Sequence, residues 1–479
     1  MNDFNTRYKL VREACNYFHP ILNKTEDFDK FIRQVDKELD EVKLEVINKC
    51  IEDFDEELRD SVPEGWTIGH KVNRKVTCVF GKLSFKRTLF FDQYGRKRYL
   101  ADELLGIPYK SRFSGDAVIW LLKRVYEVSY GKTARDFTNM SGAPISKMGV
   151  WFMVQKQAAL IQLMDKTPNL EPISQENICV ETDGIFIALQ KPERRKKAIS
   201  RFLADQQRNK QSFELKCGCI YAGKVKENNR VRRINVDLLA HVGTASCFMQ
   251  MLRRRIKNEY CIEDLNNLFY GSDGGAWCKN HDIDLILDAK TDCHNSLDDF
   301  HLMQCVARAF SPGNARDWIV NLLIRKKPCR ALKAIDKMLP KIHGNKRVKV
   351  QQLRKYIANN YDLIMPKFNL GTMEATHAKI WAPRMKKIGG AWSKHGGHAM
   401  AVLLAHINSG KKLIPPAKQV FFSKKEMRMQ KIGIERLGKE VMKQKRVGKG
   451  YEPPQAHAAK LSGKQLYIPG CFHKCQLQI

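Results

Sequence analysis

Two aspartates stand where apolar, strand-like stretches of the sequence meet a glycine. Asp183 interrupts the run 177–189, and Asp273 ends the run 268–272. An isolated ionised carboxylate is costly in apolar surroundings unless a cation or a partner accompanies it. If the two strands are parallel neighbours, both carboxylates come to one edge of the sheet. The alternative interpretation is that each Asp-Gly pair is only a turn at the end of a strand.

Carboxylates that converge in this way can bind divalent cations. Mg²⁺ prefers oxygen ligands and keeps several waters, so two or three carboxylates and a substrate phosphate suffice. Two such ions about 4 Å apart can clamp the attacking and leaving oxygens of a phosphoryl transfer. In a basic chain, this pattern indicates nuclease or strand-transfer chemistry.

The charge of the chain favours a polyanionic partner. Its 479 residues include 84 Lys and Arg against 51 Asp and Glu, a formal charge of +33. Residues 26–60 hold 14 acidic and 6 basic side chains, so the rest of the chain carries +41. Repulsion among these positive charges is reduced when they bind a polyanion. Nucleic acid is the obvious polyanion, because the affinity of a protein for it comes mainly from phosphate contacts. An anionic membrane surface is less favoured because the basic residues do not gather on one amphipathic helix.

Compartment and cysteine usage agree with an intracellular DNA-binding protein. No apolar run approaches 18 residues and residues 1–20 do not resemble a signal peptide, so we expect no membrane span and a cytosolic location. The 43% apolar share excludes wholesale disorder. Two cysteine clusters, Cys217-Gly218-Cys219 and Cys471-Phe472-His473-Lys474-Cys475, lack the CxxC spacing of zinc sites. We therefore predict reduced thiols rather than zinc ligands.

The first 168 residues contain three kinds of element. Apolar residues recur every three or four positions over 28–58, which predicts a helix that either packs on the body or pairs with a second copy. Alternation over 72–89 around a glycine predicts a basic β-hairpin. Residues 115–165 resemble a helix-turn-helix, with Thr133 and Ser146 as N-caps. The candidates for DNA contact in this region are Lys132, Lys147 and Lys156.

Strands and basic helices dominate the rest of the chain. Strands are predicted over 177–189, 213–221, 231–241 and 283–288, and a helix over 245–259. Residues 302–363 are helical and basic, and a basic tail begins near residue 410. Further candidates for DNA contact are Arg194, Arg195, Lys196, Lys197, Arg253, Arg254 and Arg255.

Four short motifs follow one another in a fixed order. They are Glu181-Thr182-Asp183-Gly184, Gly271-Ser272-Asp273-Gly274, Leu297-Asp298-Asp299-Phe300-His301 and Gly371-Thr372-Met373-Glu374-Ala375-Thr376-His377. The stretches Arg384-Met385-Lys386-Lys387 and Ala391-Trp392-Ser393 fit the same pattern. Over about residues 60–410, the chain resembles the DDE transposases of bacterial insertion sequences, specifically the ISLre-type family, with kinship to the Mutator-like group.

The resemblance implies an α/β fold with a ribonuclease-H-like core. It implies that Asp183, Asp273 and Glu374 bind two Mg²⁺ ions, with Mn²⁺ as a possible substitute. Asp298 and His301 match the C/D-x-x-H motif, and His301 either contacts DNA near the scissile phosphate or is a packed structural histidine. The expected layout is a helical region (1–62), a β-hairpin and helix-turn-helix region for DNA binding (63–168), the core (169–408) with a helical insertion at about 302–365, and a basic tail (409–479).

Glu374 is expected to be the third metal ligand in preference to other late acids. Thr372 can cap a helix there, and a glutamate in the first turn suits the helix dipole. Thr376 and His377 are expected to support it from the same helix. The acids set aside are Asp299, Asp317 and Asp362.

The resulting functional hypothesis is a DNA transposase of the bacterial cytosol and nucleoid. It would bind terminal repeats, cleave at the element ends and transfer the 3′-hydroxyls to target DNA, as a homodimer or higher oligomer. No nucleophilic serine or tyrosine is needed. The alternatives are a nuclease of the same fold without strand transfer, and a DNA-binding regulator that has lost catalysis.

Overall fold

The computed structural model describes residues 2–414, except residues 25–26, 108–109, 167–170, 191–211, 228–229, 280–282, 289, 367, 369 and 389. The described residues all belong to one compact unit, Met1–Val420. The basic loop at 194–197, the cluster of Cys471, His473 and Cys475, and most of the predicted tail lie outside the described residues. Within the described ranges, no helix combines the length and apolar character that crossing a bilayer requires.

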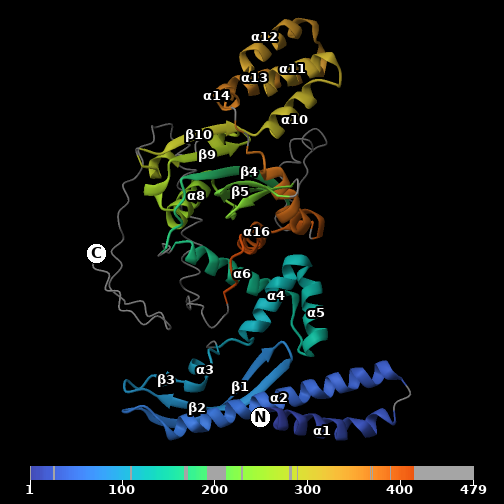
Figure 1. Ribbon diagram of the computed structural model, residues 1–479, viewed down its shortest axis with the longest axis vertical. Coiled ribbons are helices and arrows are strands. Elements are labelled where there is room, and N and C mark those ends of the chain that lie inside the picture. Colours follow the sequence, from blue (N-terminus) through green and yellow to red (C-terminus); the bar gives the residue numbers. More distant parts are fainter. Residues whose placement is uncertain are drawn as a thin grey trace, which may run out of the picture. The chain divides into compact units, whose positions relative to one another are not determined.

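A six-stranded mixed sheet forms the centre of the chain (Figure 1). The strand order is β10-β9-β4-β5-β8, and β11 pairs with the end of β4. β4, β9 and β10 are parallel to one another, whereas β5 runs antiparallel to both of its neighbours. The strands are β4 (Asn177–Leu189), β5 (Ser212–Tyr221), β8 (Asp237–His241), β9 (Asn267–Ser272), β10 (Asp292–Leu297) and β11 (Ala391–Trp392). The chain is thus a mixed α/β protein.

Helices cover both faces of this sheet because its strands are apolar on both. α6 (Lys147–Met164) and α16 (Lys394–Asn408) pack on one face, and α8 (Ala245–Glu259) packs on the other. The alternation of a strand is visible in β8, where Leu238 and Ala240 join the first cluster and Leu239 joins the second. This burial on both faces explains the nearly continuous apolar runs of the sequence.

Two predicted strands differ from the structure. The predicted strand 231–241 is two strands, β7 (Arg230–Ile234) and β8, which are separated at Asn235 by a positive φ of 51°. β7 forms a separate hairpin with β6 (Gly223–Glu227). The run 283–288 contains a 3₁₀ turn (Ile283–Ile286), and the next strand is β10. Ile283 is fully buried beneath α8, and a short apolar run alone does not distinguish a strand from a helical turn.

The region predicted to be a helix-turn-helix consists of α4 (Gly115–Glu127), α5 (Tyr130–Ser141) and α6. The cap of α6 by Ser146 is confirmed, since its side chain accepts from the Gly149 N–H. The predicted Thr133 cap is wrong, because α5 begins one turn earlier, is capped by Ser129 and buries Thr133. These helices share one hydrophobic cluster with the sheet and α16. Their packing is therefore continuous with the central sheet.

A helical insertion, coloured yellow to orange in Figure 1, separates β10 from the last helices. It contains its own hydrophobic cluster, and α14 contacts β10. The insertion comprises α10 (Asp299–Ala309), α11 (Asn314–Ile324), α12 (Pro328–Met338), α13 (Gly344–Asn359) and α14 (Tyr361–Ile364). The helical character predicted for 302–363 is confirmed.

The N-terminal region pairs an acidic helix with a basic hairpin. Its elements are α1 (Asn2–Leu22), α2 (Phe28–Asp60), β1 (Thr67–Cys78), β2 (Gly81–Phe91), β3 (Lys97–Arg98) and α3 (Leu100–Leu104). The predicted hairpin is confirmed as β1 and β2. The C-terminal half of α2 packs on it through Leu44, Ile47 and Ile51, while Phe28, Ile32, Leu39, Val42 and Val46 are exposed. The pairing of α2 with a second copy stays a prediction for the exposed half.

α2 also satisfies the free edge of the hairpin. Backbone N–H groups at alternate positions of β2 donate to side chains one helical turn apart on α2. The donors are Ser84, Lys86 and Thr88, and the acceptors are Asn48, Glu52 and Asp55, at 3.0, 2.7 and 2.8 Å. Two of the three acceptors, Glu52 and Asp55, are acidic, so part of the negative charge of α2 is used to bond the backbone of the hairpin.

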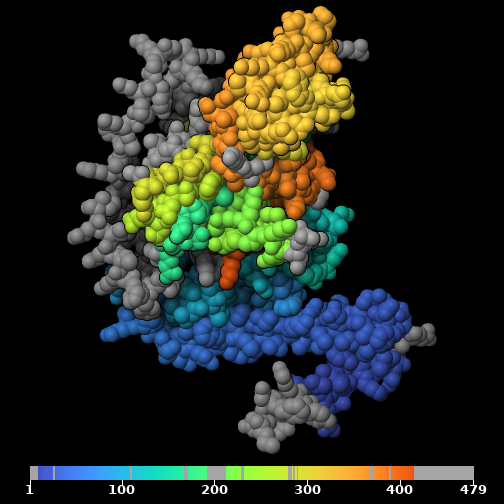
Figure 2. All heavy atoms as spheres, turned by 45° about the horizontal axis from the view of Figure 1, so that its top comes forward, coloured from blue at the N-terminus to red at the C-terminus, as the bar shows by residue number. Residues whose placement is uncertain are grey.

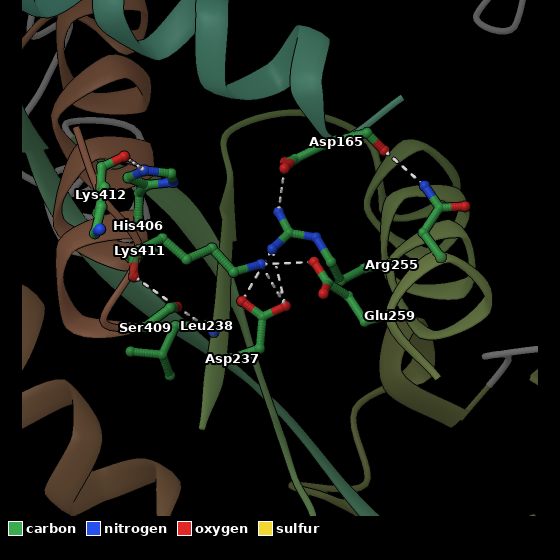
Figure 3. A network of polar contacts seen from close by, with 11 residues as sticks. Asp165, Asp237, Leu238, Arg255, Glu259, His406, Ser409, Lys411 and Lys412 are labelled. Carbon is green, nitrogen blue, oxygen red and sulfur yellow. Dashed lines mark hydrogen bonds and ion pairs between the residues drawn. The ribbon is translucent and has the colours of Figure 1, made fainter. Parts of the chain in front are cut away.

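A buried polar network joins α6, β8, α8 and the segment after α16 (Figure 3). Arg255 Nη1 donates to both carboxylate oxygens of Asp237, at 2.9 and 2.8 Å, and its Nη2 lies 2.5 Å from Asp165. Lys411 Nζ donates to Asp237 at 3.1 Å and to Glu259 at 2.7 Å. Burial alone would raise the pKa of Asp237, but the charges of Arg255 and Lys411 outweigh it and lower the pKa.

Asp237→Asn is expected to reduce the free energy of unfolding by about 3 kcal/mol at neutral pH. This is the low end of the range for breaking a buried ion pair, because Asp165 still pairs with Arg255. The folded-state pKa of Asp237 is lowered, so its stabilisation is present above the unfolded pKa of about 3.9 and is lost as the pH falls through the folded value. Urea unfolding between pH 7 and pH 3 measures both effects.

The matched control is Asp336→Asn. Asp336 pairs with Arg354 at 2.5 Å, but both side chains are almost half exposed. This change should therefore cost at most about 1 kcal/mol. An equal effect of the two substitutions would contradict the structural role given to the buried network.

Candidate active site

β4 and β9 bring Asp183 and Asp273 to one cleft. The strands are parallel neighbours, with Thr182 opposite Ser272, so the residue after each of these is an aspartate at the same level of the sheet. Both aspartates line one pocket. This is the juxtaposition expected if the two strands are parallel neighbours. One detail differs, because β4 continues beyond Asp183 to Leu189, where β5 and β11 still pair with it.

Gly274 has a conformational reason to follow Asp273. Its φ is +73°, a region that disfavours L side chains. A Cβ atom there would also lie 2.5 Å from Asn360 Oδ1 and 2.7 Å from Leu297 Cδ1. Gly274 therefore allows the chain to turn toward the insertion directly after Asp273. From the insertion, Tyr356 Oη donates to the carbonyl oxygen of Asp273 at 2.7 Å.

Two histidines from distant segments flank Asp183. His301 Nε2 lies 3.4 Å from Asp183 Oδ2, and His377 Nε2 lies 3.2 Å from the same oxygen. The Asp183 side chain is buried, which by itself raises its pKa, but the two rings together hold the pKa well below its usual range. The same contact raises the pKa of His301 against the opposing effect of burial. Asp183 is therefore held ionised at the floor of the cleft.

Asp298 stands at the start of the helix that carries His301. Its carboxylate caps α10 by accepting from the Phe300 N–H at 2.9 Å, and it also lines the cleft. Burial raises the pKa of Asp298 despite this hydrogen bond. The motif that suggested Asp298 and His301 thus places both beside Asp183.

Glu374 is not gathered with the two aspartates. It lies in the first turn of α15 (Met373–Thr376) and is exposed, whereas its neighbour Met373 lines the cleft. Thr372 occupies the N-cap position of α15 as predicted, but its side chain makes no capping bond, because the hydroxyl donates to Glu181 Oε1 instead, at 2.5 Å. Two π-helical turns follow, His377–Trp381 and Pro383–Ile388, and the first of them presents His377 to Asp183.

Glu181 is the site residue that the sequence reasoning missed. It lies two residues before Asp183 on the same face of β4, is fully buried and lines the cleft. Its carboxylate accepts from Tyr221 Oη at 2.8 Å and from the Thr372 N–H at 2.7 Å. Arg233 donates to the Thr372 hydroxyl at 3.0 Å, which holds the same loop from the β6–β7 hairpin. The period-two spacing of Glu181 and Asp183 was the signal available.

The cleft has the donor chemistry of a divalent-cation site but does not yet enclose one. Asp183, Asp273 and Asp298 offer the oxygen ligands that Mg²⁺ prefers. No three His, Cys, Asp or Glu side chains of the described residues are close enough together to hold an ion as they stand. The carboxylates therefore fit Mg²⁺ by type and by location.

The candidates for DNA contact differ in exposure. Lys132 and Lys147 are exposed near the starts of α5 and α6, and Arg254 is exposed on α8. Lys156 and Arg253 are half-buried, and burial lowers the pKa of Lys156. The prediction that Arg255 contacts DNA is wrong, because Arg255 is buried in ion pairs with Asp237 and Asp165 and presents no face to a phosphate. Arg194, Arg195, Lys196 and Lys197 lie outside the described residues.

The described cysteine cluster agrees with the thiol interpretation. Cys217 and Cys219 are fully buried as free thiols in the core of the sheet. Burial raises the pKa of Cys219 to about 12, and Arg233 Nη1 donates to its sulfur at 2.9 Å. A thiol that stays protonated is a poor metal ligand.

Comparison with known proteins gives a family without an assigned function. Residues 22–416 match the model described as "Uncharacterised protein family (UPF0236)". A UPF0236 protein from the vanSb 3′ region of Streptococcus gallolyticus is 22% identical over 388 residues, covering 78% of this chain and 81% of that protein. Another relative, from Caldanaerobacter subterraneus subsp. tengcongensis, is 22% identical over 420 residues, covering 84% and 82%, and its name joins eleven locus designations.

Among solved structures, the Drosophila P element transposase strand transfer complex gives a weak match. It is 9% identical, covers 63% of this chain and 80% of that chain, and has a TM-score of 0.23. A superposition at this level supports no conclusion about fold or function.

Proposed function

This chain belongs to UPF0236, an uncharacterised protein family, and we propose that it is a DNA transposase. In this proposal, the protein cleaves the ends of its own element and joins their 3′-hydroxyls to target DNA. The observation that carries the proposal is the pair of carboxylates, Asp183 and Asp273, on adjacent parallel strands in one cleft of a chain with a charge of +33. Converging acids in a polycation suit phosphoryl transfer on nucleic acid.

The strand order supports a ribonuclease-H-like core. Three strands in antiparallel succession, β4, β5 and β8, are followed by two strands parallel to β4 on its other side, with helices on both faces. The helical insertion falls between β10 and α15, as the resemblance to DDE transposases implies. The assignment to the ISLre-type DDE transposases and the ribonuclease-H-like core are both parts of this proposal.

In the proposed site, Asp183, Asp273 and Glu374 hold two Mg²⁺ ions, for which Mn²⁺ is a possible substitute. When bound, the ions supply charge stabilisation and help to ionise an attacking water or 3′-hydroxyl. His301 and His377 keep Asp183 ionised and oriented. Glu181 fixes Thr372, two residues before Glu374, and so positions the start of α15.

DNA recognition is assigned to the β1–β2 hairpin and the α4–α6 region. Lys132 and Lys147 are the exposed candidates there. Two element ends must be held together, so a homodimer or higher oligomer is part of the proposal, and the exposed stripe of α2 is the candidate contact. The name of the Caldanaerobacter relative, which joins eleven locus designations, also agrees with a protein encoded at many loci, as a mobile element is expected to be.

Cleavage by the full-length protein tests this function. We expect a labelled duplex that carries the DNA flanking the chain's own gene to be cut at the element end with Mg²⁺ or Mn²⁺, and not after chelation of divalent cations. The alternatives are a nuclease without joining activity and a DNA-binding regulator without cleavage. Binding without metal-dependent cleavage would overturn the transposase assignment in favour of the regulator.

A further inference from the structure

The helical insertion concentrates positive charge outside the cleft. Residues 299–364 contain fourteen Lys and Arg against four Asp and no Glu, a formal charge of +10 in 66 residues. Two of the four acids are already engaged, since Asp299 pairs with Lys326 and Asp336 with Arg354. The insertion forms an extended body in the space-filling view, coloured yellow to orange (Figure 2).

The charge forms a stripe on α12. Arg330, Lys333 and Lys337 are exposed at positions i, i+3 and i+7, on a different face of the helix from the buried Ala331, Ala334 and Ile335. The Arg354–Asp336 pair brings α13 alongside this stripe. Arg347 is exposed two turns before Arg354, so it falls on the same side of α13. We call the surface of Arg330, Lys333, Lys337, Arg347 and Arg354 the α12–α13 face.

The insertion that carries this face contacts the catalytic cleft through several of its helices. α10 begins at Asp298, whose carboxylate lines the cleft, and α13 is tied to the Asp273 carbonyl by the Tyr356 hydroxyl at 2.7 Å. α14 packs against β10, the strand that leads into Asp298. The insertion is thus held to the cleft wall at both ends of its helical run, and a polyanion bound to it is held at a fixed distance from Asp183 and Asp273.

We propose that the α12–α13 face binds the phosphate backbone of double-stranded DNA that runs out of the catalytic cleft. The inference rests on the proposed function and adds a second DNA contact, separate from the hairpin and helix-turn-helix. Duplex DNA is favoured over a single strand because α12 has no aromatic residue, and the one aromatic of α13, Tyr356, is half-buried with its hydroxyl bound to Asp273. Single-strand binding surfaces use exposed aromatics on which bases stack.

Charge reversal on α12 tests the inference in the full-length chain. The variant Arg330→Glu/Lys333→Glu/Lys337→Glu should bind a 40-base-pair duplex at least tenfold more weakly than the wild type at one salt concentration. The slope of log affinity against log salt should fall by up to about 2.7, because each phosphate that the variant no longer neutralises removes about 0.9 from the slope. Glutamine at the same three positions should give an intermediate effect. Circular dichroism and thermal unfolding verify that the fold is retained.

The matched control lies on α2. Lys30, Arg33 and Lys37 are exposed with the same i, i+3, i+7 spacing, so their reversal to Glu changes the net charge by the same amount. This control should bind duplex within about twofold of the wild type. If the α12 variant loses no more affinity than the α2 variant, or loses affinity equally for a single strand of the same sequence, the inference is wrong. If such a result is obtained while the wild type cuts DNA with Mg²⁺, only this inference is wrong and the proposed function stands. If the wild type neither binds nor cuts DNA, the inference and the proposed function are both wrong.

Discussion

Asp183→Asn is expected to abolish DNA cleavage and strand transfer, with a decrease of at least about 1000-fold in rate. Asparagine keeps the shape of the side chain but removes the charge that lies 3.4 and 3.2 Å from His301 and His377. A factor of 1000 corresponds to roughly 4 kcal/mol of transition-state stabilisation, a reasonable value for removal of a metal ligand. Asp273→Asn should have the same effect. Gel assays of cleavage and filter binding of the same duplex separate catalysis from binding.

DNA binding and folding should survive these changes, because the surfaces proposed to contact phosphates lie outside the cleft. Asp292→Asn is the control, since Asp292 is exposed at the opposite end of the sheet, at the start of β10. It should cleave at the wild-type rate. If Asp183→Asn retains activity within tenfold of the wild type, the carboxylate pair is not the catalytic centre.

Glu374→Gln is expected to cause a similar decrease in cleavage and strand transfer, with end binding retained. Glu374 is exposed in this structure, but it adjoins Met373, which lines the cleft, and it begins a helix whose preceding loop is held by Glu181. A carboxylate in the first turn of a helix also suits the positive end of the helix dipole. Asp317→Asn and Asp362→Asn, which alter exposed acids of the insertion, should stay active with Mg²⁺.

Asp298 is the alternative candidate for the third metal-binding carboxylate. It is buried and lines the cleft beside Asp183, whereas Glu374 does not line it. If Glu374→Gln cleaves at the wild-type rate and Asp298→Asn is inactive, the acidic triad must be redrawn with Asp298. The comparison requires both variants to unfold at the same temperature as the wild type, because Asp298 also caps α10.

Local patterns in the sequence predicted most of the elements that position the site. Alternation around a glycine indicated β1 and β2, an apolar run indicated β4, and the 3.6-residue period indicated α2. The meeting of Asp183 and Asp273 was predicted on the condition that their two strands are parallel neighbours. The structure meets this condition, because β4 and β9 pair in parallel with Thr182 opposite Ser272.

The errors arose where long-range contacts decide the outcome. The run Arg253-Arg254-Arg255 suggested that Arg255 is exposed, but Arg255 forms ion pairs with Asp237 on β8 and with Asp165 at the end of α6. The Thr372 side chain was predicted to cap α15, but its hydroxyl donates a hydrogen bond to Glu181 on β4 instead. His377, at the start of the π-helical turn that follows α15, meets Asp183 on β4. None of these pairings has a signature in the spacing of neighbouring residues.

Joining of labelled 3′-hydroxyl ends to a target plasmid is the most direct test of the central claim. The full-length protein, a pre-cleaved labelled end, the plasmid and Mg²⁺ are incubated together, and the products are separated on a denaturing gel. We expect the label to appear covalently linked to plasmid DNA with the wild type, and not with Asp183→Asn or after chelation of the metal. If the wild type cuts DNA but never joins it, or if Asp183→Asn joins ends as well as the wild type, the strand-transfer function proposed for this cleft is contradicted.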